Sequence, residues 1–315
     1  MNWKISDDSL LTLNWCLEKS DDEIIKFYVV KTIENISALT QISKLYFTKD
    51  ERFLVNLVSV VNSTKNADLK VSAVYSISHI IRLEPKLFKI FVEKVGVVNI
   101  INLAEKENSK IQQALINILL NGIYKDNQII LKNEFLVPLC NFMLKLFETP
   151  NNVIRIKIML IFTLIFENSV IVSKFGEKIF NHIQKFRKEN SPEMLQAIKV
   201  FEATVQIKIK LMVKNFIYLL SNNIANSNYH DEILQHFNSF LTYNSYSKLL
   251  PFVYTQDLLE ILIKIIDSDY ISEETITKNI FQLISNFSEN PKCVLDNNDF
   301  ILKKMLIPLL SVCLK

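Results

Sequence analysis

The sequence predicts an all-α protein built from stacked helical repeats. The chain of 315 residues contains only 3 glycines and 7 prolines, which argues against hairpin-rich sheets, phosphate-binding loops and long flexible linkers. Its apolar residues recur three and four positions apart, as on one face of a helix. Similar helices return at intervals of roughly 37 to 47 residues, the period of armadillo and HEAT repeats. We therefore expect a right-handed α-solenoid of about six to seven repeats.

The repeating unit is clearest between Leu69 and Ala104. The apolar face of its first helix is formed by Val71, Val74, Ile77 and Ile81. Because a proline lacks a backbone donor and restricts the residue before it, the helix is predicted to end near Leu83 and a short one to begin at Pro85. Gly96 is predicted to end the short helix, and the helix VVNIINLAEK follows.

Such a unit has more apolar surface than it can bury alone, so it needs copies on either side. Helices that resemble the opening of VVNIINLAE begin at Phe53, Phe135, Ile179, Phe216, Leu258 and Met305. A solenoid of this kind does not need one central core, so the length alone does not require two domains.

The chain is predicted to begin with a leader or cap, residues 1–20, followed by the repeat solenoid, residues 21–315. Ser20 and Glu23 have the spacing of a capping box, which predicts a helix through Leu39. Five acidic residues near these helix starts fit the positive end of the helix dipole better than a calcium loop. They are Asp7, Asp8, Asp21, Asp22 and Glu23.

The next helix starts follow the same logic of caps and breaks. Asp50 is expected to cap the helix at Phe53, and either Asn66 or Asp68 is expected to cap the helix after it. Ser109 is expected to start the helix QQALINILLNGIY. Gly122 predicts a termination or a local bend near the end of that helix.

Later repeats are predicted with less regular boundaries. A short helix is expected over Asn127–Lys132, and Pro138 is expected in the first turn of the following helix. The unit from Val153 to Arg187 places Gly176 where Gly96 stands earlier. A helix starting at Ser191-Pro192-Glu193 runs toward Asn223, with a boundary expected near Lys208 to Lys210. The pattern resumes after Asn228, and the apolar C-terminal end predicts a continuation of the chain or an oligomer contact.

The helices that close each unit supply the candidate binding residues. Four frames, KTIENISAL, YSISHIIRL, ALINILLNG and QLISNFSEN, each set a polar residue inside apolar surroundings. Their equivalent positions are Asn35, His79, Asn117 and Asn286. Closing helices line the groove of armadillo folds, and amides there can grip the backbone of an extended peptide. The alternative is that these side chains tie neighbouring repeats together.

A second candidate surface is basic. Its residues are Lys185, Arg187 and Lys188, followed by Lys199, Lys208, Lys210 and Lys214. Such a stripe suits an acidic peptide, a tubulin tail or a nucleic acid, of which the nucleic acid is least favoured because no aromatic residues are interleaved for base stacking. A solvated helix face is favoured over all three of these partners, and the net charge of +3 neither requires nor excludes an acidic partner.

The sequence contains no motif that supports catalysis, a cofactor, a metal ion or a small-molecule substrate. The cysteines, Cys16, Cys140, Cys293 and Cys313, form no Cys-x-x-Cys pair and are expected to be free thiols in a reducing cytoplasm. His230 and His236 are six residues apart, which does not match paired ligation from one helix face. The enzymatic alternative requires Cys140 or Cys293 to lie beside a histidine.

The mean hydropathy of +0.19 is high for a soluble protein, but the chain contains no apolar run of the length of a membrane span. The longest apolar run covers residues 158–166, about half of what a span needs, so we expect a buried helix. The N-terminus lacks the apolar core of a signal peptide. These observations predict a cytoplasmic protein.

One family resembles part of this chain. The frame KTIENI at Lys31–Ile36 and the stretch Leu69–Gly96 are similar to the armadillo-like repeat region of the Unc-51-like kinase 4/RUNKEL family of Fused-type pseudokinases. The similarity covers about a quarter of the chain and fades after about Ile123, and the chain has none of the kinase motifs. The resemblance implies a non-catalytic scaffold whose partner is a kinase or a cytoskeletal or ciliary protein, located at the cytoskeleton or cilium. The alternative function is a nuclear-transport or vesicle-tethering adaptor that binds linear cargo motifs.

Overall fold

The computed structural model describes residues 5–39, 47, 51–106, 109–125, 133–166, 168–189, 191–222 and 255–266, with short stretches and single positions between 278 and 304. All regular structure in these ranges is helical, which confirms the all-α prediction. The chain divides into two compact units, Met1–Leu164 and Ile165–Lys315. Each unit is described by itself below. None of the described helices combines the length and the apolar character that a membrane crossing requires.

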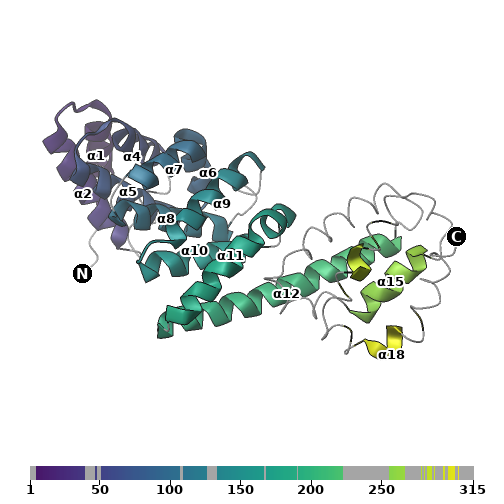
Figure 1. Ribbon diagram of the computed structural model, residues 1–315. Coiled ribbons are helices and arrows are strands. Elements are labelled where there is room, and N and C mark those ends of the chain that lie inside the picture. Colours follow the sequence, from purple (N-terminus) through teal and green to yellow (C-terminus); the bar gives the residue numbers. More distant parts are fainter. Residues whose placement is uncertain are drawn as a thin grey trace. The chain divides into compact units, whose positions relative to one another are not determined.

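The first unit contains most of the described helices (Figure 1). They are α1 (Asp7–Lys19), α2 (Glu23–Ala38), α4 (Arg52–Ser63), α5 (Ala67–Leu83), α6 (Leu87–Val95), α7 (Val97–Lys106), α8 (Ser109–Lys125), α9 (Asn133–Phe147) and α10 (Asn152–Ile165). The second unit contains α11 (Ser169–Glu189), α12 (Pro192–Asn222), α15 (Gln256–Ile266) and the short α18 (Asn298–Phe300).

The closing helices of successive repeats stack directly on one another. α2 packs against α5, and α5 packs against α8. Beside this stack, α4 packs against α5 and α7 packs against α8. Ser76 lies fully buried on α5, where its small side chain allows close approach and its hydroxyl donates to the Val30 carbonyl of α2 at 3.4 Å and to Ser72 within α5 at 2.8 Å. This stacking is the layered arrangement that the repeat period predicts.

The breaks around the short helix α6 follow the predicted chemistry. α5 ends at Leu83, a turn over Pro85 leads into α6, and Gly96 ends α6 with a φ of 78° that glycine adopts without side-chain strain. Asn66 caps α5 by accepting from the amides of Asp68 and Leu69 at 3.0 and 3.1 Å. These boundaries are set by local backbone properties, and the sequence predicts them to within two residues, because α6 begins at Leu87 and not at Pro85.

The N-terminal residues fold as a helix on the first repeat. α1 packs against α2 and α4, and the side-chain amide of Asn56 donates to Asn14 at 2.8 Å. The cap of α2 is Asp22, which accepts from the amides of Ile24 and Ile25, whereas Ser20 accepts from Asp22. The predicted capping box is therefore wrong, because the Glu23 carboxylate accepts instead from Thr64 at 2.8 Å.

Two glycines and a proline have other roles than predicted. Gly122 is buried inside α8, which runs on to Lys125, and the glycine is required because the Phe88 ring occupies the space of a Cβ. Gly176 lies within the continuous helix α11 instead of ending a short one. Pro138 lies inside α9, because this helix begins at Asn133 and not at Phe135.

The long helix α12 also corrects a boundary. It begins at Pro192, as predicted, but continues through 31 residues to Asn222 without the expected break near Lys208 to Lys210. The predicted cap Asp50, the predicted short helix at Asn127–Lys132 and the apolar C-terminal layer lie outside the described residues. Glu51 precedes α4 and makes no side-chain cap hydrogen bond.

Candidate peptide-binding face

Three of the four candidate groove residues lie on helices that stack in succession. Asn35 belongs to α2, His79 to α5 and Asn117 to α8, while Asn286 lies outside the described residues. Asn35 is exposed, and His79 and Asn117 are half-buried, so all three reach the surface of the stack. We call the surface formed by the outward strips of α2, α5 and α8 the closing-helix face.

On α2, the outward strip combines an aromatic ring with polar groups. Tyr28 precedes Asn35 by seven residues, which places both on one side of the helix, and its side chain is 66% exposed. Between them, Lys31 Nζ pairs with Glu34 Oε2 at 2.9 Å, and Thr32 donates to its own helix at the Tyr28 carbonyl. This strip therefore offers a flat ring and an exposed amide.

On α5, the strip is centred on His79. Burial, and next the positive charge of Arg82, lower the pKa of His79 from its ordinary value of 6.5, while Glu34 across the helix pair acts in the opposite direction. The His79 ring lies beside the Tyr75 ring at 6.5 Å between centroids, and Arg82 Nη2 donates to the Ala38 carbonyl of α2 at 3.5 Å. At neutral pH the imidazole is uncharged, with one donor and one acceptor.

On α8, the strip repeats the pattern of amides and a ring. Gln113, Asn117 and Asn121 are half-buried at intervals of four residues, and Tyr124 follows Asn117 by seven. The Tyr124 side chain is 68% exposed, and the Lys125 ammonium lies over its ring at 5.6 Å. The repeat frame alone does not predict these neighbours, but each of the three candidate residues on the closing-helix face has a tyrosine four or seven positions away, and this spacing is the sequence signal for them.

The basic residues belong to α11 and α12. Lys185, Arg187 and Lys188 lie in the last turns of α11, and Arg187 Nη2 pairs with Glu202 Oε1 of α12 at 2.5 Å. Arg187 is therefore engaged in holding α11 against α12. The use of the remaining lysines of α12, namely Lys199, Lys208, Lys210 and Lys214, as a binding surface stays a prediction.

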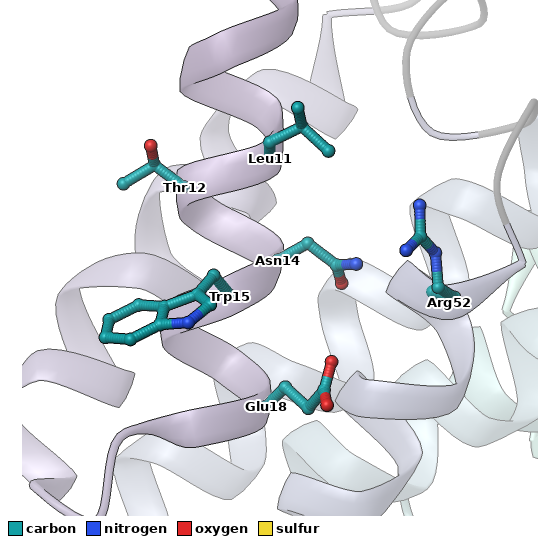
Figure 2. A pocket seen from close by; sticks show the side chains of 6 residues that line it. All are labelled: Leu11, Thr12, Asn14, Trp15, Glu18 and Arg52. Carbon is teal, nitrogen blue, oxygen red and sulfur yellow. The ribbon is translucent and has the colours of Figure 1, made fainter.

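A shallow hollow of about 370 Å³ lies between α1 and α4 (Figure 2). Asn14 and Glu18 project toward Arg52 of α4, whereas Trp15 projects to another side of α1. The pKa of the exposed Glu18 is lowered by its hydrogen bond to Lys19 and the charge of that lysine, with Arg52 adding a smaller effect in the same direction. The hollow thus contains an ionised carboxylate beside a cation, which does not form an acid–base pair for catalysis.

Cys140 is buried in α9, and this burial raises the pKa of its thiol far above the ordinary value. A thiol that stays protonated is a poor nucleophile, so this environment opposes the catalytic alternative at Cys140. Cys293 and Cys313, with His230 and His236, lie outside the described residues. Across the described part of the chain, no group of three or more His, Cys, Asp or Glu side chains could hold a metal ion.

Comparison with known proteins supports the fold. No family model matches the chain. The chain is 23% identical to the mouse serine/threonine-protein kinase ULK4 over 196 residues, which cover 60% of this chain but only 15% of that protein. This similarity extends beyond the quarter of the chain that the quoted motifs cover.

Two designed proteins show the architecture in solved structures. A computationally designed armadillo repeat protein for modular peptide recognition matches 62% of this chain and 82% of its own, with a TM-score of 0.55 and 14% identity. The designed armadillo repeat protein YIII(Dq)4CqI matches 88% of this chain and 99% of its own, with a TM-score of 0.51 and 14% identity. The fold is thus that of armadillo repeats, in agreement with the predicted α-solenoid.

Proposed function

We propose that this chain is a non-catalytic armadillo-type scaffold that holds an extended segment of a partner protein along the closing-helix face. The observation that carries the proposal is the placement of Asn35, His79 and Asn117 on three helices that pack in succession. A fold shared with a designed protein made for modular peptide recognition supports it.

The chemistry of the three residues suits a peptide backbone. A side-chain amide can donate to a peptide carbonyl and accept from a peptide N–H at the same time. The neutral His79 ring also offers one donor and one acceptor, so it can replace an amide in the series. Packed helices lie about 8–10 Å apart and an extended chain rises about 3.3 Å per residue, so each helix would meet the peptide about once in three residues.

The exposed tyrosines add side-chain contacts to this backbone recognition. Tyr28 and Tyr124 lie on the same strips as Asn35 and Asn117 and present large, rigid surfaces at low conformational cost. Two of the charged side chains on the face already have partners: Lys31 forms a salt bridge with Glu34, and Arg82 donates a hydrogen bond to the Ala38 carbonyl. Backbone and aromatic contacts therefore outweigh charge in the expected recognition.

The test uses peptides selected on the full chain from a random library, with binding measured by fluorescence anisotropy. The double variant Asn35→Ala/Asn117→Ala removes two amides and is expected to weaken binding by about tenfold or more, since each hydrogen bond contributes about 0.5–1.5 kcal/mol. The matched control Asn62→Ala/Asn215→Ala removes two exposed amides on α4 and α12 and should leave binding unchanged. Equal affinities for the two double variants would refute this binding face.

The identity of the partner rests on the family resemblance. We propose a kinase or a cytoskeletal or ciliary protein as partner, and the cytoplasm, near the cytoskeleton or cilium, as the place of action. Proximity labelling by the tagged chain in its own cells should then recover kinases or ciliary proteins. Recovery of transport receptors with their cargo would instead favour the adaptor function.

A further inference from the structure

The long helix α12 has two apolar faces on opposite sides, and only one of them is buried. The buried face packs within the second unit, where α12 contacts α11 and α15. Its side chains are at most 2% exposed and include Phe201, Val205, Ile209 and Val213. The other face carries Val200, Ile207, Leu211 and Tyr218, whose exposed fractions are 45%, 59%, 55% and 67%.

The four exposed side chains form a narrow seam. Their spacings of seven, four and seven residues place them within an arc of about 40° on a helix of 3.6 residues per turn, over about 27 Å of its length. The intervening positions of the same four-and-three pattern are Thr204 and Lys214. The Thr204 hydroxyl donates a hydrogen bond to the Val200 carbonyl of the same helix at 2.8 Å, so this donor is satisfied within the seam. Such spacing is typical of the contact line between two packed helices.

The seam is bordered by positive charge. Lys208 lies on one side, and Lys199, Lys210 and Lys214 lie on the other side or at its edge, as their positions around the helix dictate. The acidic Glu202 is turned about 160° away from the seam and pairs with Arg187 of α11. Glu193, in the first turn, is the acidic residue that shares the seam side.

This charge pattern selects among occupants of the seam. A second copy of α12 would bring lysines against lysines, which is unfavourable at the flanks of a helix pair. A membrane surface prefers a wide apolar face, whereas this seam is narrow and interrupted by Lys214. An amphipathic helix with acidic flanks satisfies both the apolar line and the lysines.

We propose that the exposed seam of α12 docks an amphipathic helix of a partner protein whose flanking residues are acidic. This site is separate from the closing-helix face, which belongs to the first unit and recognises an extended segment. The partner helix would lie along α12 over residues 200–218, with its apolar residues between Val200, Ile207, Leu211 and Tyr218 and its carboxylates toward the lysines.

The probe is a dye-labelled helical peptide of about four heptads, with leucine and isoleucine at the seam positions and glutamate at the flanks. The control peptide has the same seam and lysine at the flanks. Anisotropy titrations with the full chain should show binding of the acidic peptide at least tenfold tighter than that of the basic one. Raising the salt from about 50 to about 500 mM should weaken the acidic complex several-fold.

The variant Ile207→Gln/Leu211→Gln tests the seam itself. It should weaken binding of the acidic peptide at least tenfold, whereas the control Leu11→Gln/Ile24→Gln, at 57% and 68% exposure elsewhere, should bind as the parent does. Glutamine keeps a high helix propensity, and the four positions are exposed, so circular dichroism should show unchanged melting. If the double variant Ile207→Gln/Leu211→Gln does not fold, the double variant Val200→Gln/Tyr218→Gln replaces it in the same measurement.

Four results would overturn the proposal. The first is equal binding of the acidic and basic peptides, and the second is unchanged binding of the acidic peptide by the variant Ile207→Gln/Leu211→Gln. The third is that the parent self-associates and this variant does not. The fourth is that the parent binds vesicles with about a third phosphatidylserine and this variant does not. The third result would assign the seam to a second copy, and the fourth to an anionic membrane. Peptide binding to the closing-helix face is measured with different variants, so either proposal can fail alone.

Discussion

Gly122 shows how a single hydrogen atom can be the only side chain that fits. It lies inside α8, where a helix normally gains stability from alanine, but a Cβ placed there would lie 2.1 Å from Cγ of Phe88 on α6. Phe88 is itself fully buried, so its ring has little room to move. Close contact between α6 and α8 therefore depends on this glycine.

Gly122→Ala should lower the free energy of unfolding by about 1–3 kcal/mol, because overpacking outweighs the gain of about 1 kcal/mol in helix propensity. Urea unfolding of the parent, Gly122→Ala, Phe88→Leu and the double variant measures both the loss and its origin. The double variant should lose less than the two single losses added together, by about 0.5–3 kcal/mol. Additive losses would show that the alanine does not clash with the ring.

His79 predicts a dependence of stability on pH. Its pKa in the folded chain is lowered by burial and by Arg82. Just below about pH 6.5, His79 is therefore protonated in the unfolded chain while it is still neutral in the folded chain. The free energy of unfolding should therefore fall as the pH is lowered through about 6.5. Below the pKa of His79 in the folded chain, the residue is protonated in both states and its contribution no longer changes with pH. Above that range the histidine is neutral in both states and contributes no slope.

The variant His79→Gln isolates this contribution, because glutamine keeps a donor and an acceptor but does not titrate. In urea unfolding at a series of pH values, the parent should lose stability relative to the variant as the medium becomes acidic. Parallel pH profiles for the two proteins would mean that His79 titrates alike in the folded and unfolded chain.

At the level of elements, the features that the sequence predicts are those decided within a few residues of the chain. Pro85 and Gly96 end helices through their own backbone geometry, and Asn66 caps α5 through its own side chain. Gly122 and Pro138 are predicted wrongly. Gly122 is required by a ring on another helix, and Pro138 lies inside α9 because that helix begins two residues earlier than predicted.

The candidate site follows the same division. The repeat frame places Asn35, His79 and Asn117 on stacked helices, since equivalent positions of a repeat are brought together by the stacking itself. The lowered pKa of His79 is caused first by burial and next by the charge of Arg82, and the burial depends on packing that no local pattern reveals.

Asn66→Ala should lower the free energy of unfolding by about 1 kcal/mol, because the amides of Asp68 and Leu69 lose their acceptor at the start of α5. Asn62→Ala, at an exposed site four residues earlier, is the matched control and should change stability by less than about 0.5 kcal/mol. Thermal unfolding followed by circular dichroism compares the two. A similar small change in both variants would show that water satisfies these amides without the cap.

At the level of the whole molecule, stability should be local, because each layer of a repeat protein packs mainly on its neighbours. The first unit is held by the stack of α2, α5 and α8, with side chains such as Ile33 fully buried in it. The second unit has its own aromatic cluster, in which Phe201 meets Phe166 at 6.0 Å and Phe180 at 5.7 Å between ring centroids. A cavity in one unit should therefore weaken that unit first.

Two cavity variants of the full chain separate the units by hydrogen exchange read by mass spectrometry. Ile33→Ala should cost about 2–5 kcal/mol and speed amide exchange in α2, α5 and their neighbours α1 and α4, while α11 and α12 keep the protection of the parent. Phe201→Ala should cost about 3–5 kcal/mol and show the reverse pattern, with faster exchange in α11 and α12. If either variant accelerated exchange equally in all of these helices, the chain would unfold as one cooperative body, and the division into two compact units would have no energetic meaning.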